Sequence, residues 1–151
     1  MNKPFAIALV SLMLFSRIGY AAEETGAKKP DLIISSFKVM PPEPTSNDEI
    51  RIEGLKYRNI GDVAVPDATE ICLGCRIFKK DGSLFKICSD AAFKYYGLRP
   101  DSETTAVNYY IGAIMAGEYR VELTCDSLKT VNESNEANNT VSFFLTVKNS
   151  N

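Results

Sequence analysis

Near the C-terminal end of the chain, two segments of alternating apolar and polar residues flank a short polar run. The regularly spaced positions are Tyr119, Val121, Leu123 and Cys125 before the run, and Val141, Phe143, Leu145 and Val147 after it. A period of two is typical of a strand with one buried and one solvated face. The run from Glu133 to Asn139 is rich in Asn, Ser and Glu, which suit a turn. These features predict a β-hairpin of an antiparallel sheet.

Alternation of the same kind runs through much of the chain after residue 31. It predicts further strands around residues 32–39, 50–57, 71–77, 84–88 and 105–109. In the second of these, the apolar positions change phase at Gly54, where a β-bulge would restore the facing. Residues 91–97 form an irregular region that carries the aromatics Phe93, Tyr95 and Tyr96. About seven strands with short turns and no amphipathic helix indicate an all-β antiparallel sandwich of two sheets.

The N-terminal residues have the pattern of an export signal. A short positive end at Met1–Lys3 precedes an apolar run, Pro4–Phe15, that is too short to span a bilayer. Small residues lie just before the expected cleavage point after Ala21. An uncleaved anchor is the alternative, but Arg17 interrupts the run. We therefore expect a signal peptide over 1–21, a flexible leader over 22–29 and no transmembrane segment in the mature chain.

Composition argues against several classes of function. The chain has 17 basic and 19 acidic residues, and this balance does not favour nucleic-acid binding. It contains no histidine, which excludes His-dependent triads, His general bases and His-ligated metals. Neither a Gly-x-Ser-x-Gly elbow nor a phosphate-binding glycine loop is present. We therefore do not expect an enzyme, and a small hydrolase using carboxylates is the least favoured alternative.

Four cysteines remain after removal of the signal: Cys72, Cys75, Cys88 and Cys125. An even number in an exported chain favours two disulfides. A redox Cys-x-x-Cys site is disfavoured because such motifs normally begin a helix, whereas this pair lies in a strand pattern. A four-cysteine zinc site is disfavoured because only one close pair is present.

The hairpin signal at residues 80–83 decides which cysteines can pair. A two-residue loop at Asp81-Gly82 puts Cys75 directly opposite Cys88. A three-residue loop at 80–82 instead leaves Cys88 diagonal to Cys72 and leaves Cys75 for Cys125. We favour the second register, hence Cys72–Cys88 with Cys75–Cys125, because it buries the hydrophobic residues better. Both pairings remain open.

Three segments, in order, resemble the CARDB domain, the cell adhesion related domain of bacteria. They are Pro30-Asp-Leu-Ile-Ile34, Tyr57-Arg-Asn-Ile-Gly61, and Ala116-Gly-Glu-Tyr119 leading into Glu133-Ser-Asn-Glu-Ala-Asn-Asn139. The resemblance covers about residues 30–148, and the last segment is its most specific element. It implies an immunoglobulin-like or fibronectin III-like sandwich on exported bacterial proteins, used for binding or as a spacer. It also implies a periplasmic or secreted location.

Two groups of residues are candidate sites. Asp126, Glu133, Glu136 and Asn138 offer the oxygen ligands that calcium prefers, although turn capping accounts for the same residues and regular ligand spacing is absent. Phe93, Tyr95, Tyr96 and Tyr110 are candidates for a partner-binding surface, with core packing as the alternative. We expect no other cofactor.

The sequence thus predicts an exported, non-catalytic binding or adhesion module that recognises a protein or a cell-envelope component. The alternative is a structural subunit of an extracellular or periplasmic assembly, stapled by disulfides and without a discrete ligand.

Overall fold

The computed structural model describes residues 27–106 and 108–150, so the predicted signal peptide and residues 22–26 of the predicted leader lie outside the described residues. The described part contains nine strands and no helix. They are β1 (Leu32–Met40), β2 (Ile50–Asn59), β3 (Thr69–Lys79), β4 (Leu84–Ile87), β5 (Ala91–Tyr95), β6 (Glu103–Thr105), β7 (Tyr109–Gly112), β8 (Gly117–Thr124) and β9 (Thr140–Val147).

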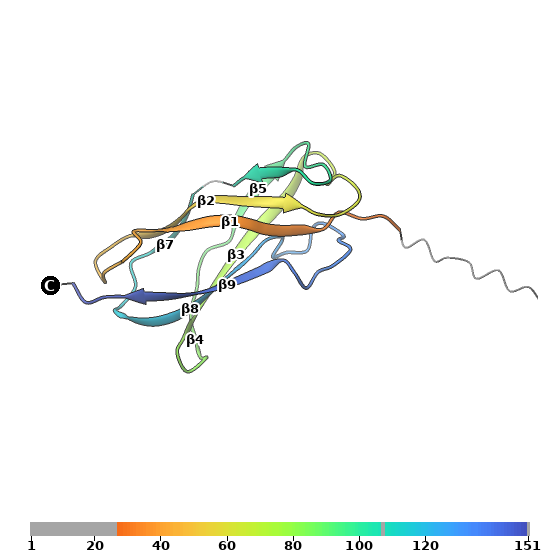
Figure 1. The fold of residues 1–151 in the computed structure, drawn as a ribbon. Helices are drawn as coiled ribbons and strands as arrows, with labels where there is room; N and C mark the ends of the chain where they lie inside the picture. The colour runs from red at the N-terminus through yellow and green to blue at the C-terminus, as the bar shows by residue number, and fades with distance from the viewer. Residues whose placement is uncertain (1–26, 107, 151) are drawn as a thin grey trace, which may run out of the picture.

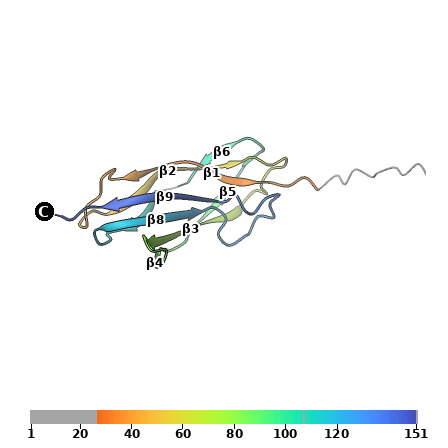
Figure 2. The same cartoon turned by 60° about the horizontal axis from the view of Figure 1, so that its bottom comes forward.

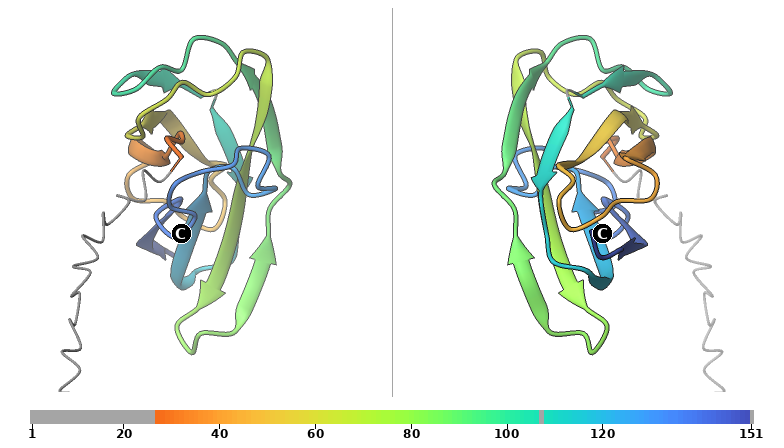
Figure 3. Two further views of the ribbon diagram at one scale, coloured as in Figure 1. Left: turned by 90° about the vertical axis from the view of Figure 1, so that its right-hand side faces the viewer. Right: turned by 90° about the vertical axis from the view of Figure 1, so that its left-hand side faces the viewer.

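The strands form two antiparallel sheets packed face to face (Figures 1 and 3). One sheet has the order β1-β2-β6, with β7 also pairing with β2; the other has the order β4-β3-β8-β9, with β5 also pairing with β3. Strands β4 and β5 thus share one edge of the long β3, and β6 and β7 share one edge of β2. The nine strands fill seven positions, which confirms the predicted two-sheet sandwich of about seven strands.

The core lies between the two sheets and uses the alternation seen in the sequence. Its fully buried side chains include Ile50, Ile52, Leu55, Tyr57, Ile71, Leu73, Ile77, Val121 and Leu123. Burying each aliphatic side chain stabilises the fold by about 1.5–3 kcal/mol relative to leaving it exposed. Gly54 adopts a left-handed φ of 59°, and the β1–β2 register shifts beside it. The predicted β-bulge is confirmed, and it returns Leu55 to the core side.

The β3–β4 hairpin combines features of both predicted registers. Lys79 N donates to Ser83 O at 2.9 Å, so the loop has the three residues that we favoured. A bulge at Phe85 then shifts the register, pairing Ile77 with Lys86. The pairing therefore ends with Cys88 N donating to Cys75 O at 3.0 Å. The expectation that Cys88 lies diagonal to Cys72 is wrong, because one extra residue in β4 moves Cys88 opposite Cys75.

The aromatic segment that we expected to be irregular is largely strand β5. It pairs with the N-terminal half of β3, with Thr69 opposite Tyr95 and Ile71 opposite Phe93. Because directly opposed residues share a face, both aromatic side chains point towards the core. The alternation is hard to recognise here, since the strand has only five residues and begins with two alanines.

The two ends of the described chain lie at opposite ends of the elongated sandwich (Figures 1 and 2). Strands β1 and β9 are edge strands of different sheets, and they approach one another along one side of the molecule. There Phe37 and Phe143 lie with their ring centroids 5.1 Å apart, closing that side of the sandwich.

Candidate functional site

The turn from Glu133 to Asn139 lies against the start of β1. The Glu133 side chain is buried, and its Oε2 atom accepts a hydrogen bond from Leu32 N. Its Oε1 atom accepts one from Asn139 Nδ2 at 2.7 Å. Asp31 is held by the same turn, since its carboxylate accepts from Ser134 Oγ at 2.9 Å and from Asn138 Nδ2 at 2.8 Å. The turn thus fastens the first strand to the last hairpin.

The end of β2 holds the same segment from the other side. The buried Asn59 amide accepts from Asp31 N at 3.1 Å and from Gly61 N at 3.0 Å. A Cβ atom at Gly61 would lie 2.4 Å from Lys29 O, so only glycine fits there. We call the contacts among residues 29–32, 59–61 and 133–139 the N-terminal clasp. The Pro30–Ile34 and Tyr57–Gly61 segments meet the Glu133–Asn139 run in it.

Burial dominates the chemistry of Glu133. It raises the pKa of this carboxyl to about 7, although the hydrogen bonds from Leu32 N and Asn139 oppose the shift. Loss of hydration disfavours the charged form, and the nearby Asp126 and Glu136 carboxylates add to the effect. The Oδ1 atom of Asn139 is buried without a hydrogen-bond partner among the described residues. If the Asn139 side-chain amide were flipped, its Oδ1 atom would face Glu133 and could accept a hydrogen bond from the protonated carboxyl.

The predicted calcium ligands are engaged within the protein. Asp126 caps the turn after β8: its carboxylate accepts from Thr130 N at 3.0 Å and from Val131 N at 2.8 Å. Asn138 bonds Asp31, and Glu136 lies 3.6 Å from the Lys129 ammonium. Within residues 27–106 and 108–150, no three acidic or cysteine side chains gather in a way that could hold a metal ion. Calcium binding stays a prediction, and it would require these hydrogen bonds to be given up.

All four cysteines are buried and free in the structure, so neither predicted bridge is shown. The Cys75 and Cys88 thiols hydrogen-bond one another, and this contact holds the pKa of Cys88 below its usual value. Burial raises the pKa of the other two, Cys72 and Cys125. Cys125 faces the core, where its Sγ lies 3.5 Å from Leu32 O, whereas Cys72 lies on the outer side of β3 and its carbonyl accepts Ser127 N. Those two are on opposite faces of one sheet.

The predicted aromatic candidates are divided between the core and the surface. Tyr95 is 7% exposed and packs on Tyr57, with their ring centroids 5.5 Å apart. Phe93 packs against the core as well. Tyr96 and Tyr110 are 68% and 65% exposed, respectively. Tyr110 lies on the outer face of β7 opposite Arg51, while Tyr96 follows β5 at the other sheet. The four residues therefore do not form one surface.

A different set of apolar side chains gathers on the outer face of the β4-β3-β8-β9 sheet. Opposed residues across its strands run from Leu84 on β4 to Phe78 on β3, then to Arg120 on β8 and Phe144 on β9. Ile87, opposite Arg76, extends the row, and Leu84, Ile87 and Phe144 are all exposed. We call Phe78, Leu84, Ile87, Arg120 and Phe144 the Phe144 face. Figure 2 shows β9, β8 and β3 side by side beneath it.

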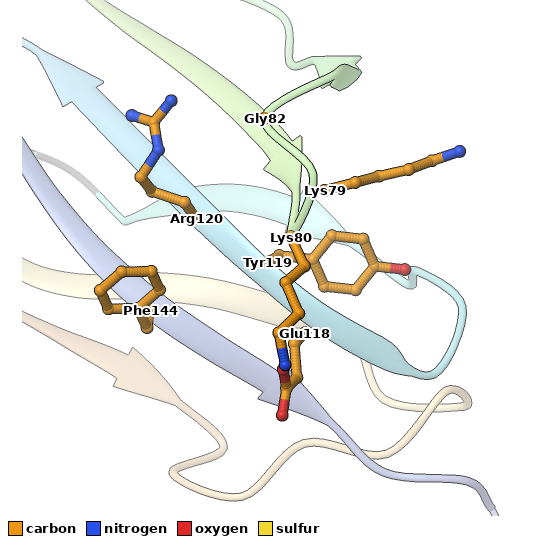
Figure 4. A pocket seen from close by; sticks show the side chains of 7 residues that line it. All are labelled: Lys79, Lys80, Gly82, Glu118, Tyr119, Arg120 and Phe144. Carbon is orange, nitrogen blue, oxygen red and sulfur yellow. The ribbon is translucent and has the colours of Figure 1, made fainter.

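Phe144 is the most exposed large apolar residue in the described chain, at 87%. A hollow of about 160 Å³ flanks it, lined by Lys80, Glu118 and Arg120 among others (Figure 4). The Arg120 guanidinium lies 4.3 Å from the ring centroid of Phe78, within reach of a cation–π interaction, and is paired with the Glu122 carboxylate. The face thus joins aromatic rings to a positioned cation.

Sequence reasoning missed this face, although a signal was present. Phe143 and Phe144 are adjacent in an alternating strand, so only one of them can point into the core. The alternation assigns Phe143 to the core and therefore places Phe144 outside.

Comparison with known proteins agrees with the geometry. The CARDB family model matches residues 29–143. The chain belongs to the CARDB family. CARDB domains are adhesion-related modules. The match begins and ends close to the predicted range of 30–148, and it contains all three segments of the N-terminal clasp.

Solved CARDB domains share the fold. The crystal structure of the CARDB domain of the PF1109 protein from Pyrococcus furiosus, determined in complex with di-metal ions, is 24% identical with a TM-score of 0.57, covering 81% of this chain and 96% of that one. A domain of a predicted cell surface protein from Methanosarcina acetivorans is 21% identical with a TM-score of 0.54, covering 79% and 92%. No curated protein matches the chain.

Residues 27–106 and 108–150 contain no helix that is long and apolar enough to cross a membrane.

Proposed function

We propose that this CARDB domain is an exported, non-catalytic binding module that recognises a protein or a cell-envelope component through the Phe144 face. The observation that carries the proposal is Phe144 itself, a phenylalanine that is 87% exposed on an ordered strand. Contiguous exposed apolar groups on a soluble domain commonly mark an interaction site. Aromatic and arginine side chains are also the types enriched at protein interfaces.

The composition of the face supports a protein partner rather than a small ligand. Its apolar residues lie on β3, β4 and β9, with Arg120 of β8 between them, and the hollow between Phe144 and Lys80 on this face measures only about 160 Å³. Small-molecule sites are usually concave pockets of about 300–1,000 Å³. A flat face with one protruding ring and charged neighbours is better suited to a second macromolecule.

Export and oxidation form the second part of the proposal. The apolar segment after Met1 supports signal-directed export, and the similar Methanosarcina acetivorans domain belongs to a predicted cell surface protein. We place the mature domain in the periplasm or outside the cell. In that environment Cys75 and Cys88 would form a disulfide, because they lie opposite one another and the hydrogen-bonded Cys88 thiol has a lowered pKa.

Capture of the partner tests the binding site. The chain and its Phe144→Ala variant would be used as bait on extracts of the cell envelope, with Tyr96→Ala as a matched control that removes an equally prominent ring elsewhere. Losing a central aromatic anchor costs about 2 kcal/mol or more, so we expect the affinity of the Phe144 variant to fall at least about 30-fold. Unchanged capture by the Phe144 variant would contradict the proposed face.

Tyr96 and Tyr110 define the competing surface, since both rings are exposed. Loss of capture by Tyr96→Ala or Tyr110→Ala, with full capture by Phe144→Ala, would move the binding site to one of these residues while leaving the binding function in place.

A further inference from the structure

Most edge strands of this sandwich carry a feature that prevents another strand from pairing with them. Lysine is present in β1, β4 and β5, at Lys38, Lys86 and Lys94. Strand β6 has only three residues. Strand β7 contains the left-handed Gly112, and its Ile111 carbonyl accepts the Lys86 ammonium at 2.7 Å. Charges, short strands and irregular backbone are the usual protection of a sheet edge.

Strand β9 has none of these features. Its eight residues, TVSFFLTV, include no charge, no proline and no glycine, and its pairing with β8 is continuous from Thr140 to Val147. β-branched and aromatic residues make up most of it, the composition with the highest strand propensity. A long, regular and uncharged edge is a template for another strand.

The backbone groups at this edge point outward at alternate residues. Lys148 N donates to Pro44 O and Lys148 O accepts Ser46 N, so both groups of Lys148 face away from β8. Asn139 O instead accepts Cys125 N, on the β8 side. Successive residues of a strand direct their backbone N–H and C=O groups to opposite sides, so every second residue between Asn139 and Lys148 faces the open edge. The four are Thr140, Ser142, Phe144 and Thr146.

These outward groups have no partner within the described chain. The 44–46 segment covers the edge only at Lys148, through an isolated parallel bridge to Thr45. Next to it, a hollow of about 380 Å³ lined by Val39, Pro42 and Phe144 opens beside the edge. The sheet thus ends in unused hydrogen-bonding groups with room beside them.

We propose that β9 pairs antiparallel with β9 of a second copy of this chain, joining two sandwiches into one continuous sheet. A two-fold axis perpendicular to the sheet places the core-side residues of both copies on the same side of the joined sheet. Directly opposed residues also share a side, so every residue has to face one that is an even number of positions away. The axis therefore passes beside a residue and not between two residues. A centre at Phe143 places Thr140 opposite the partner's Thr146 and Ser142 opposite the partner's Phe144. All four outward-facing residues then find partners.

A second copy meets the requirements of this edge. The entering strand has to be extended, uncharged along its length and free on one side, and β9 is itself such a strand. Self-pairing of β9 opposes no like charges, whereas self-pairing of β1, β4 or β5 would bring a lysine from each copy into the joined edge. The pairing does not depend on the partner recognised by the Phe144 face, and it needs no other protein.

The mass of the purified chain in solution tests the pairing. Ser142→Pro removes one outward N–H without touching a β8–β9 hydrogen bond, and Ser142→Ala keeps that N–H while removing the same hydroxyl. We expect a concentration-dependent dimer for the natural chain and for Ser142→Ala. We expect a monomer for Ser142→Pro, with the circular dichroism spectrum of a folded sandwich.

Two results would overturn the proposal. One is a natural chain that stays monomeric at the highest soluble concentration, which is also the outcome expected if the edge accepts a strand from a different protein. The other is a dimer that Ser142→Pro leaves intact. If Ser142→Pro fails to fold, Thr146→Pro and its control Thr146→Ala repeat the test at another outward-facing position.

Discussion

Glu133 is the residue whose chemistry the fold changes most. Because it belongs to a polar turn, its sequence context predicts a solvent-exposed side chain. Its carboxyl is instead buried between Leu32 N and Asn139. The sequence predicted the turn from the types of its residues. It could not predict that this carboxyl is buried, because burial depends on where residues 29–32 pack, about a hundred positions earlier in the chain.

The raised pKa of Glu133 predicts a pH-dependent stability. Its folded-state pKa of about 7 lies above the ordinary value of 4.5, so its contribution is fully present below about pH 4.5 and is lost as the pH rises through about 7. The shift corresponds to about 3 kcal/mol. Urea unfolding of the natural chain should therefore show lower stability at pH 8 than at pH 5.

Glu133→Gln provides the comparison. The glutamine stays neutral and, with the Asn139 amide flipped, can donate to Asn139 Oδ1, so the variant should lose this component of the pH dependence and gain stability at pH 8. Glu136→Gln, at an exposed position of the same turn, should behave like the natural chain. An identical pH profile for the natural chain and Glu133→Gln would contradict the assignment.

Asn59 makes a second prediction at the scale of a residue. Its amide accepts from Asp31 N and Gly61 N and donates to Val63 O and Leu98 O, all near the buried end of β2. Asn59→Ala leaves these backbone groups without partners, and we expect a loss of about 3 kcal/mol or more in the free energy of unfolding. Asn135→Ala, at an exposed turn position, should cost much less, and equal effects of the two changes would count against the clasp.

At the scale of elements, alternation predicted most strands, and the errors arose where a single residue changes the register. The loop of the β3–β4 hairpin has the predicted three residues, but the bulge at Phe85 has no sequence signature comparable to Gly54. Strand β5 was missed because it is short and follows the break at Cys88–Asp90. Local propensity does not show that β4 and β5 both pair with β3.

With the export proposed above, the observed register predicts one disulfide. Peptide mapping without reduction should find Cys75 joined to Cys88, with Cys72 and Cys125 as thiols, since those two lie on opposite faces of their sheet. A bridge between Cys72 and Cys88, or between Cys75 and Cys125, would show that the β4 bulge is absent in the oxidised protein.

At the scale of the whole molecule, the three motifs that resemble CARDB serve to hold the fold together. Residues 30–34, 57–61 and 133–139 of these motifs meet in the N-terminal clasp, where their side chains bond one another and the backbone. Glu118 and Tyr119, from the first part of the third motif, lie instead at the start of β8 beside Phe144. The motifs identify the family. The sequence could not locate the Phe144 face in advance, because it consists of single residues from β3, β4, β8 and β9 that only the sheet register brings together.

Photo-crosslinking in the producing cells tests the binding face most directly. A photoreactive phenylalanine analogue would replace Phe144, Tyr96 or Tyr110 in three separate chains, each at an exposed ring on a different part of the surface. We predict that the analogue at position 144 crosslinks a protein or envelope component and that the analogues at positions 96 and 110 do not. Crosslinks at position 96 or 110, with none at position 144, would contradict the account.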